Sequence, residues 1–313
     1  MKKLIAVVFC SLFTLPILAQ HDPQFSLNQF NMPAISPAVV GLENGVSASA
    51  LIREQWIGIE GRPSTRVFNV NSILPWDAQA LGAGFTIMQD ELGFSKNIGM
   101  ELALAPHFEV AGGILSVGLG LGFNNQSFNN VEWSTAGGSL PSTDPLIPKD
   151  ESVLVFDLSA GVHYKAQDFY LGVAARHLNG PTLEYNENSS SFLKQNFYIN
   201  GGYHYTLPNP LFEITPSVFI KSDLTAHQID FNAVLEYNKQ FWGGVSYRMS
   251  DAYVAMFGVN LINGISVGMA WDFPANALGT YAAGSVEFFG RYVFDLGLQS
   301  GPTRGTSILN RGR

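Results

Sequence analysis

The sequence of 313 residues has few charged residues and a single cysteine. Lys, Arg, Asp and Glu together make up 13% of the chain, against roughly 25% in soluble domains. Cys10 lies in an N-terminal stretch that we expect to be removed, which would leave the mature chain without a thiol. A disulfide framework or a cysteine metal site is therefore excluded, and the low charge argues against an ordinary soluble domain.

Long apolar runs are also missing once the N-terminus is set aside. Lys2 and Lys3 precede an apolar run from Leu4 to Leu18, and Ala19 suits the position before a cleavage site, so residues 1–19 are predicted to be a signal peptide. No later apolar run approaches the roughly 18 residues of a membrane-spanning helix. Without the two lysines the formal charge is 15 − 25 = −10, which argues against nucleic acid as a partner.

Motifs of catalysis and metal binding are absent. None of the six histidines has HExxH spacing, and there is no GxSxG elbow. The stretch RHLNG at 176–180 contains a histidine of the kind that a barrel hydrolase uses, but Asn179-Gly180 followed by Pro181 is explained more simply as the turn that ends a strand. We expect no catalytic residues, no cofactor and no metal.

Glycine is abundant, and in SVGLGLGFNN (116–125) it recurs with period two. Gly118, Gly120 and Gly122 alternate with apolar residues. A dinucleotide-binding loop would need its third glycine farther on, at a strand-to-helix turn. The stretch therefore predicts a strand with one apolar face and one small or polar face.

Alternation of this kind predicts an all-β fold, a transmembrane antiparallel β-barrel of about 14 strands. A closed barrel satisfies every backbone polar group in a bilayer without a helix. A soluble β-sandwich is the alternative, because its strands also alternate. The predicted strands are 45–55, 66–74, 80–89, 97–106, 113–124, 153–164, 169–178, 195–205, 212–222, 228–237, 241–249, 252–261, 265–273 and 286–298.

The lengths of the connections support this count. Bacterial barrels have an even number of strands, short periplasmic turns and longer outer loops. If 45–55 is the first strand, the long connections 125–151 and 179–194 both follow odd strands. Short connections such as 207–211 and 262–264 follow even strands. Long and short connections thus separate to opposite ends of the barrel.

The inward face is predicted to carry charges of both signs, which favours structural ion pairs in a packed or plugged lumen over a solute-selective channel. These residues are Glu101, Asp157, Lys221, Asp230, Glu236, Arg248, Asp272, Glu287 and Arg291. Residues 20–44, before the first strand, contain Phe25, Phe30 and Met32 and should fold into the lumen or along the periplasmic rim. Residues 53–65 are either a Trp at the membrane interface followed by a turn or a docking element.

The same two stretches resemble the PorP/SprF family of outer-membrane proteins. The opening of the mature chain is matched by Asp22, Pro23, Gln24, Phe25 and Ser26, then Phe30, Asn31, Pro33, Ser36, Pro37, Ala38 and Gly41. An RxQW segment followed by GxPxT is matched by Arg53, Gln55 and Trp56, then Gly61, Pro63 and Thr65. The sequence departs from the family pattern at His21, Ser36 and Val39-Val40.

The resemblance implies a component of the type IX secretion system in the cell outer membrane that is not an enzyme. Implied partners are outer-membrane lipid, the periplasmic ring lipoprotein and its partner subunits, a peptidoglycan-binding protein and, in some branches, a large surface adhesin used in gliding. Expected contact residues are Asp22, Pro23, Gln24, Phe25, Ser26, Phe30, Asn31, Pro37, Arg53, Gln55 and Trp56.

Four segments are expected: the signal peptide (1–19), a pre-barrel segment (20–44), the barrel (45–299) and a basic C-terminal tail (300–313). From composition and pattern alone, three functions compete: a solute-conducting porin, a barrel enzyme and a component of an assembly. An ordered pre-barrel segment favours the assembly component, because a simple porin has little use for it.

Overall fold

The structure is a computed structural model that describes residues 22–43, 45–76, 79–128, 134–135, 138–139, 151–186 and 189–294. The predicted signal peptide and the basic tail lie outside the described residues, as does most of the long connection predicted at 125–151.

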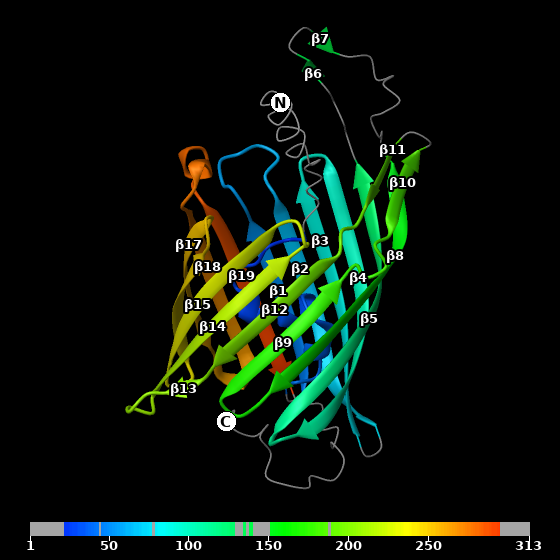
Figure 1. The fold of residues 1–313 in the computed structure, drawn as a ribbon. Coiled ribbons are helices and arrows are strands. Elements are labelled where there is room, and N and C mark those ends of the chain that lie inside the picture. The colour runs from blue at the N-terminus through cyan, green and yellow to red at the C-terminus, as the bar shows by residue number, and fades with distance from the viewer. Residues whose placement is uncertain are drawn as a thin grey trace, which may run out of the picture.

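Fourteen antiparallel strands close into a barrel (Figure 1), which confirms the predicted fold and strand number. Each strand pairs with its neighbours along the chain, and the first strand pairs with the last. The strands are β1 (Val46–Glu54), β2 (Ser64–Trp76), β3 (Gln79–Leu92), β4 (Ser95–Val110), β5 (Gly113–Phe128), β8 (Ser152–Lys165), β9 (Phe169–Arg176), β12 (Asn196–Tyr203), β14 (Phe212–Ser222), β15 (His227–Tyr237), β16 (Phe241–Arg248), β17 (Ala252–Asn260), β18 (Ile265–Pro274) and β19 (Ser285–Phe294).

The remaining elements are small. The two-residue β13 (Tyr205–Thr206) pairs with β14, while β6 (Ser134–Thr135) with β7 (Gly138–Ser139) and β10 (Thr182–Asn186) with β11 (Ser189–Phe192) form separate hairpins. Two 3-10 helices, η4 (Ile262–Gly264) and η5 (Ala277–Thr280), lie in connections. No described helix is long and apolar enough to cross a membrane.

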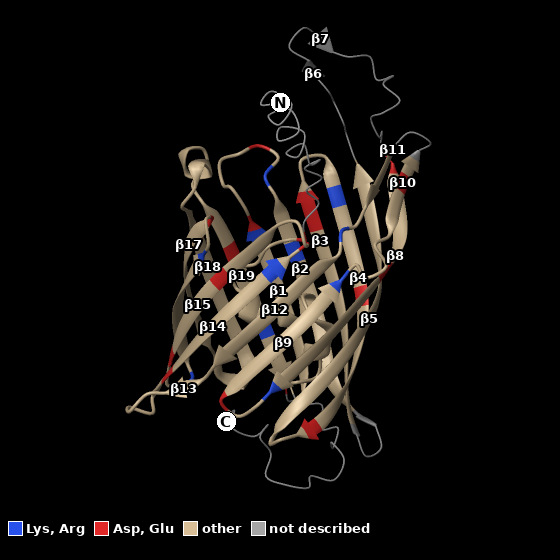
Figure 2. Ribbon diagram, in the orientation of Figure 1, with Lys and Arg blue, Asp and Glu red and all other residues tan. Residues whose placement is uncertain are grey.

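Period-two alternation explains the outer surface. On β5, Leu119 and Leu121 point outward with 63% and 56% of their surface exposed, while Gly118 and Gly120 point inward. Charged residues are sparse along the strands (Figure 2), as a lipid-facing surface requires. β4 and β5 run up to four residues beyond the predicted strands, because polar residues such as Gln126 remain in the β-ladder.

The four longest connections, 55–63, 129–151, 177–195 and 275–284, all lie at one end of the barrel, which we call the long-loop end. The opposite end, the short-turn end, has connections of two to eight residues, from 111–112 to 204–211. This arrangement agrees with the sorting predicted from the sequence.

Residues 22–43 lie inside the barrel, and we call them the plug (Figure 1). The plug contains three 3-10 helices, η1 (Asn28–Phe30), η2 (Met32–Ala34) and η3 (Pro37–Val39). Ser36 caps η3 by accepting a hydrogen bond from the amide of Ala38. Of the two predicted locations for this segment, the lumen is therefore observed.

The hydrophobic core lies between the plug and the inner wall. Phe25, Leu27 and Ile35 of the plug are at most 5% exposed, and they pack in one cluster with wall residues that include Leu51 and Phe219. Because the outward side chains face lipid, this inner cluster is where burial on folding stabilises the barrel.

Inward glycines let the plug approach the wall closely. A Cβ at Gly118 of β5 would lie 2.3 Å from the amide nitrogen of Ala38, and one at Gly82 of β3 would lie 1.9 Å from the carbonyl oxygen of Val40. Real Cβ atoms do not approach backbone this closely. Gly118 of β5 and Gly82 of β3 therefore make room for the plug.

We predict that Gly118→Ala lowers the free energy of unfolding by about 1–3 kcal/mol, because the plug backbone must shift. The matched control is Gly290→Ala on β19, where an added Cβ would meet no atom within 4 Å. Thermal unfolding followed by heat-dependent gel mobility measures both. Equal stability of the two variants would show that the plug does not depend on this close approach.

Candidate functional site in the plugged lumen

The plug is held to the wall by two polar clusters toward the long-loop end. The first, the Ser26 cluster, consists of Ser26, Arg53, Arg248, Asp272 and Glu287. Arg53 pairs with Asp272 at 2.7 Å and with Glu287 at 3.0 Å. Arg248 pairs with the same oxygen of Asp272 at 2.9 Å. These four charged residues come from β1, β16, β18 and β19, so the cluster joins distant parts of the barrel.

Ser26 binds every charged member of this cluster. Its hydroxyl accepts hydrogen bonds from Arg53 and Arg248 at 2.9 and 3.0 Å and donates to Asp272 at 2.6 Å. The amides of Ser26 and Leu27 donate to the two carboxylate oxygens of Glu287 at 2.9 and 2.8 Å. Plug and wall therefore complete each other's hydrogen bonds.

The Ser26 cluster is almost fully buried. Arg53 and Arg248 are each 1% exposed, and Glu287 is 0% exposed. Asp230 adds a third carboxylate, 3.4 Å from Arg248 Nε. Removing one partner of such a group leaves a buried charge without compensation, which is far more costly than breaking a surface pair.

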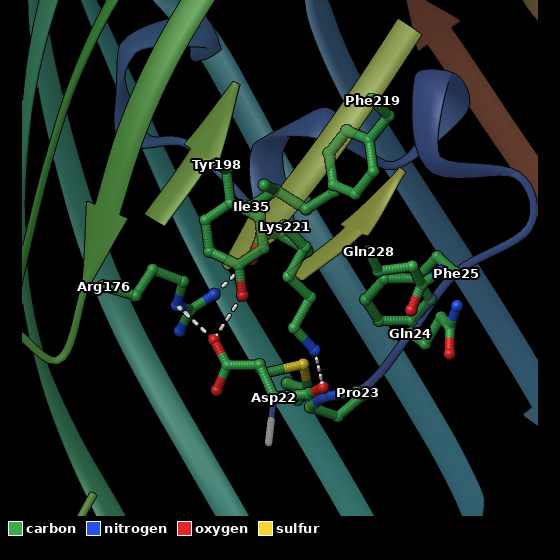
Figure 3. A pocket seen from close by; sticks show the side chains of 12 residues that line it. Asp22, Pro23, Gln24, Phe25, Ile35, Arg176, Tyr198, Phe219, Lys221 and Gln228 are labelled. Atoms are coloured by element: carbon green, nitrogen blue, oxygen red, sulfur yellow. Dashed lines mark hydrogen bonds and ion pairs between the residues drawn. The ribbon is translucent and has the colours of Figure 1, made fainter. Parts of the chain in front are cut away.

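The second cluster, the Asp22 cluster, consists of Asp22, Arg176, His177, Tyr198 and Lys221, and Figure 3 shows all of these except His177. His177 Nε2 lies 2.7 Å from one carboxylate oxygen of Asp22, and the Tyr198 hydroxyl donates to the other. Lys221 donates to the backbone carbonyl of Asp22, and Arg176 lies 4.0 Å from its carboxylate. The start of the plug is thus fixed by β9, β12 and β14.

Arg176 and His177 also connect the plug to carboxylates of the wall. Arg176 donates to the carbonyl of Ala34 and lies 3.8 Å from Glu101 of β4. His177 Nδ1 lies 2.9 Å from Asp157 of β8. Burial alone would lower the pKa of His177, but Asp22 and Asp157 outweigh it and raise the pKa to about 9. The imidazolium therefore donates a hydrogen bond to each carboxylate at neutral pH.

Most of the predicted contact residues lie inside the lumen. Asp22, Ser26 and Arg53 belong to the two clusters, Phe25 is in the core, and Phe30 stacks on Trp242 of β16 with ring centroids 4.3 Å apart. The others in the plug are Pro23 and Gln24, which line a small cavity beside Asp22, the buried Asn31, and Pro37 at the start of η3. Their contact with a partner protein stays a prediction.

Gln55 and Trp56 do not join these clusters. Both lie in the connection between β1 and β2 at the long-loop end and are half-buried. The amide of Gln55 donates to the carbonyl of Pro63, and the amide of Trp56 donates to the hydroxyl of Ser285. Trp56 has a φ of 53°, so the RxQW segment forms a turn fastened to the start of β19.

Arg176, His177 and Tyr198 anchor the plug, although none of them is among the contact residues predicted from the sequence. The prediction that a turn follows Arg176 is consistent with the structure, where the Gly180 amide donates to the carbonyl of His177. The alternation of residues along β9 could have revealed Arg176 as an inward residue, because it puts Gly172, Ala174 and Arg176 on one face. An arginine on an inward face predicts a partner carboxylate.

A cavity of about 370 Å³ lies at the short-turn end between the plug and the wall, and we call it the vestibule. Its lining includes Phe30 and Glu43 from the plug and Glu213, Glu236 and Trp242 from the wall. The volume is within the ~300–1,000 Å³ range of ligand pockets. Among the described residues, no group of three or more His, Asp or Glu is arranged to hold a metal ion.

A closed barrel with an ordered N-terminal plug is a membrane barrel of the outer-membrane type. The family model described as type IX secretion system membrane protein PorP/SprF matches residues 17–292. The chain therefore belongs to the PorP/SprF family, as the two motifs had indicated.

No curated protein matches the sequence, and three similar solved structures are 7–12% identical to it. The outer-membrane protein Omp33 of Acinetobacter baumannii is 7% identical with a TM-score of 0.48, covering 81% of this chain and 100% of that one. The toluene transporter TbuX of Ralstonia pickettii is 10% identical with a TM-score of 0.47, covering 83% and 92%. The translocator domain of NalP from Neisseria meningitidis is 12% identical with a TM-score of 0.44, covering 85% and 94%. These matches are too weak to bear on function.

We predict that Arg53→Gln lowers the free energy of unfolding by about 3–5 kcal/mol, because Asp272 and Glu287 lose their shared cation. The matched control is Arg62→Gln. Arg62 pairs with Glu54 on the surface with 43% of its side chain exposed, so its loss should cost less than about 1 kcal/mol. Denaturant unfolding of the two purified variants tests this, and similar losses would mean that the Ser26 cluster does not hold the plug.

The contribution of His177 to the stability of the folded protein should depend on pH. The pKa of His177 is raised in the folded state to about 9, so its stabilising effect is complete below the unfolded pKa of about 6.5 and is lost as pH rises through the folded pKa. The stability difference between wild type and His177→Gln should therefore be largest at acidic to neutral pH and shrink above about pH 9. Thermal midpoints measured across this range give the result, and a difference independent of pH would mean that His177 is uncharged.

Proposed function

We propose that this protein is an outer-membrane component of the type IX secretion system that docks other parts of the secretion machinery. Its partners would be the periplasmic ring lipoprotein and subunits, a peptidoglycan-binding protein and, in an adhesin-exporting or gliding branch, a large surface protein. In this role the chain is not an enzyme. Membership of the PorP/SprF family supports the assignment to this system.

The observation that carries the docking role is the plug. A solute channel needs a continuous water path, but here Leu27, Ala38 and Val40 of the plug are buried at 0 to 1% exposure inside the barrel. Two polar clusters hold the plug in the folded state. This arrangement favours a rigid membrane anchor over the alternative, a general porin or small-solute channel.

The orientation of the barrel gives each end a different set of partners. Short turns face the periplasm in bacterial barrels, so the vestibule would open toward the periplasmic ring. The long-loop end would face the cell exterior and an adhesin. At that end, the half-buried Trp56 lies in the connection between β1 and β2, and Tyr281, which is 78% exposed, lies in the connection between β18 and β19. The amide of Ile57 donates a hydrogen bond to the carbonyl of Gly284 and so joins the two connections.

The motif residues form two groups, those reachable from outside the barrel and those buried in the lumen. Gln55 and Trp56 are reachable from the long-loop end and would contact a partner directly. The buried motif residues, such as Asp22, Ser26 and Arg53, would act by ordering the plug and thereby the shape of the surface that a partner meets.

The test is gentle purification of a tagged copy from outer membranes, identification of bound proteins and conductance measurement in planar bilayers. We expect ring lipoprotein, peptidoglycan-binding protein or a giant surface protein to be recovered, with no steady conductance. Deletion of residues 20–44 should abolish secretion. An inserted barrel that still supports secretion would show that the segment is not a docking element, and failure to insert would assign the segment to barrel stability.

Point variants separate docking from stability. Trp56→Ala should reduce recovery of a surface protein bound at the long-loop end, while Phe241→Ala should not, because Phe241 is 56% exposed at the start of β16 on the opposite, short-turn end. Recovery of the barrel alone, together with stable ion conductance, would favour the porin and contradict the docking role.

A further inference from the structure

One arginine on the outer surface of the barrel has no partner. Arg66 of β2 is exposed, while Thr65 and Val67 beside it point into the lumen and are 0% and 4% exposed. Within the part of the chain that the structure describes, Arg66 makes no hydrogen bond or ion pair. The other arginines described there all pair with carboxylates. Arg66 is therefore a cation on the lipid-facing surface whose charge the chain itself does not compensate.

Arg66 lies in an otherwise uncharged row of outward residues. Its opposite residue on β1 is Ile52, which lies opposite Phe288 of β19, and these two are 45% and 53% exposed. On β3 it lies opposite Gln89. An arginine that faces lipid is strongly destabilising at the middle of the bilayer and nearly neutral at its surface. Arg66 therefore marks the level of the lipid headgroups on this side of the barrel.

The carboxylates of the next row already have cations of their own. Glu54 of β1 and Glu91 of β3 lie one row closer to the long-loop end than Arg66. Glu54 pairs with Arg62 at 3.1 Å, and Glu91 pairs with Lys96 at 3.2 Å. No carboxylate described in the structure comes within ion-pair distance of Arg66. An anion from outside the chain can therefore bind Arg66 without breaking an ion pair.

The wall on the short-turn side of Arg66 is apolar. Phe68 follows it on the outer face of β2 and is 46% exposed, and Met100 and Leu102 of β4 are 48% and 63% exposed. A ligand of Arg66 would therefore place an anionic group at the guanidinium and an apolar part along the wall, which is the chemistry of a membrane lipid. A guanidinium binds phosphate through two parallel hydrogen bonds, and phosphate is the common anion of lipid headgroups.

The end of the barrel at which Arg66 lies determines which lipid it meets. β2 begins at Ser64 at the long-loop end, and long loops face the exterior in bacterial barrels. The outer leaflet of a bacterial outer membrane consists mainly of phosphorylated glycolipid. We propose that Arg66 binds a phosphate group of this glycolipid, with the acyl chains along Phe68 and the apolar wall. This site depends on the proposed orientation of the barrel and not on its docking role.

The first measurement compares two forms of one lipid. Native mass spectrometry of the purified protein in detergent micelles gives its affinity for lipid A that carries two phosphate groups and for the same lipid after the phosphates are removed. The phosphorylated form should bind about tenfold more tightly, the ratio given by about 1.4 kcal/mol. Because both lipids meet the unaltered protein, this result does not depend on the folding of a variant.

Variants at Arg66 test which residue holds the phosphate. Arg66→Gln should weaken binding of the phosphorylated lipid about tenfold and leave binding of the dephosphorylated lipid unchanged. Arg66→Lys keeps the charge without the planar fork, so its affinity should lie between those of wild type and Arg66→Gln. The control is Lys239→Gln, which should bind as wild type does, because Lys239 is exposed in the connection between β15 and β16 at the short-turn end. Heat-dependent gel mobility shows whether each variant is folded.

Any of four outcomes would overturn the proposal. Equal affinity for the two forms of lipid A would show that the phosphate is not recognised. Wild-type affinity in folded Arg66→Gln would show that another cation holds the phosphate. A phospholipid that binds as tightly as lipid A would show that the site does not select the glycolipid of the outer leaflet. Inorganic phosphate that binds as tightly would assign a site for a free anion instead.

Discussion

The structure depends on two arginines, Arg53 and Arg248, whose charges are buried inside the barrel. A guanidinium removed from water is tolerated only when carboxylates and other acceptors surround it. The wall supplies Asp272 and Glu287, but the plug supplies the hydroxyl and amide groups of Ser26 that complete the arrangement. Barrel and plug are therefore not separable modules, because the wall without Ser26 keeps charged groups that lack part of their hydrogen bonding.

The plug follows from the size of the barrel and from how its interior is filled. Fourteen strands enclose more space than the side chains of this wall fill, since many inward positions carry glycine, serine or alanine. Lipid solvates the outer face, so a core can form only on the inside. The segment with Phe25, Leu27 and Ile35 provides that core, and the small residues of the wall give its backbone room.

Much of this architecture could be predicted from the sequence, because a β-strand repeats every two residues and the barrel repeats that pattern in fourteen strands. The alternation in β8 identified Asp157 as inward, and the mixed charges indicated ion pairs in a filled lumen. The pairing itself could not be predicted. Asp22 and His177 are 155 residues apart, and only closure of the barrel brings them together. The plug was recognisable as ordered from its aromatic residues, but no local pattern distinguished the lumen from the rim.

The two ends of the lumen differ in how closely their charged groups are paired. Toward the long-loop end, Arg53 and Asp22 bind several partners at hydrogen-bond distance. At the short-turn end, Glu213 and Glu236 oppose each other with long contacts, and Trp242 keeps an unpaired indole nitrogen. The plug is therefore held mainly by the clusters toward the long-loop end, while the short-turn end of the lumen keeps a cavity beside its opposed carboxylates.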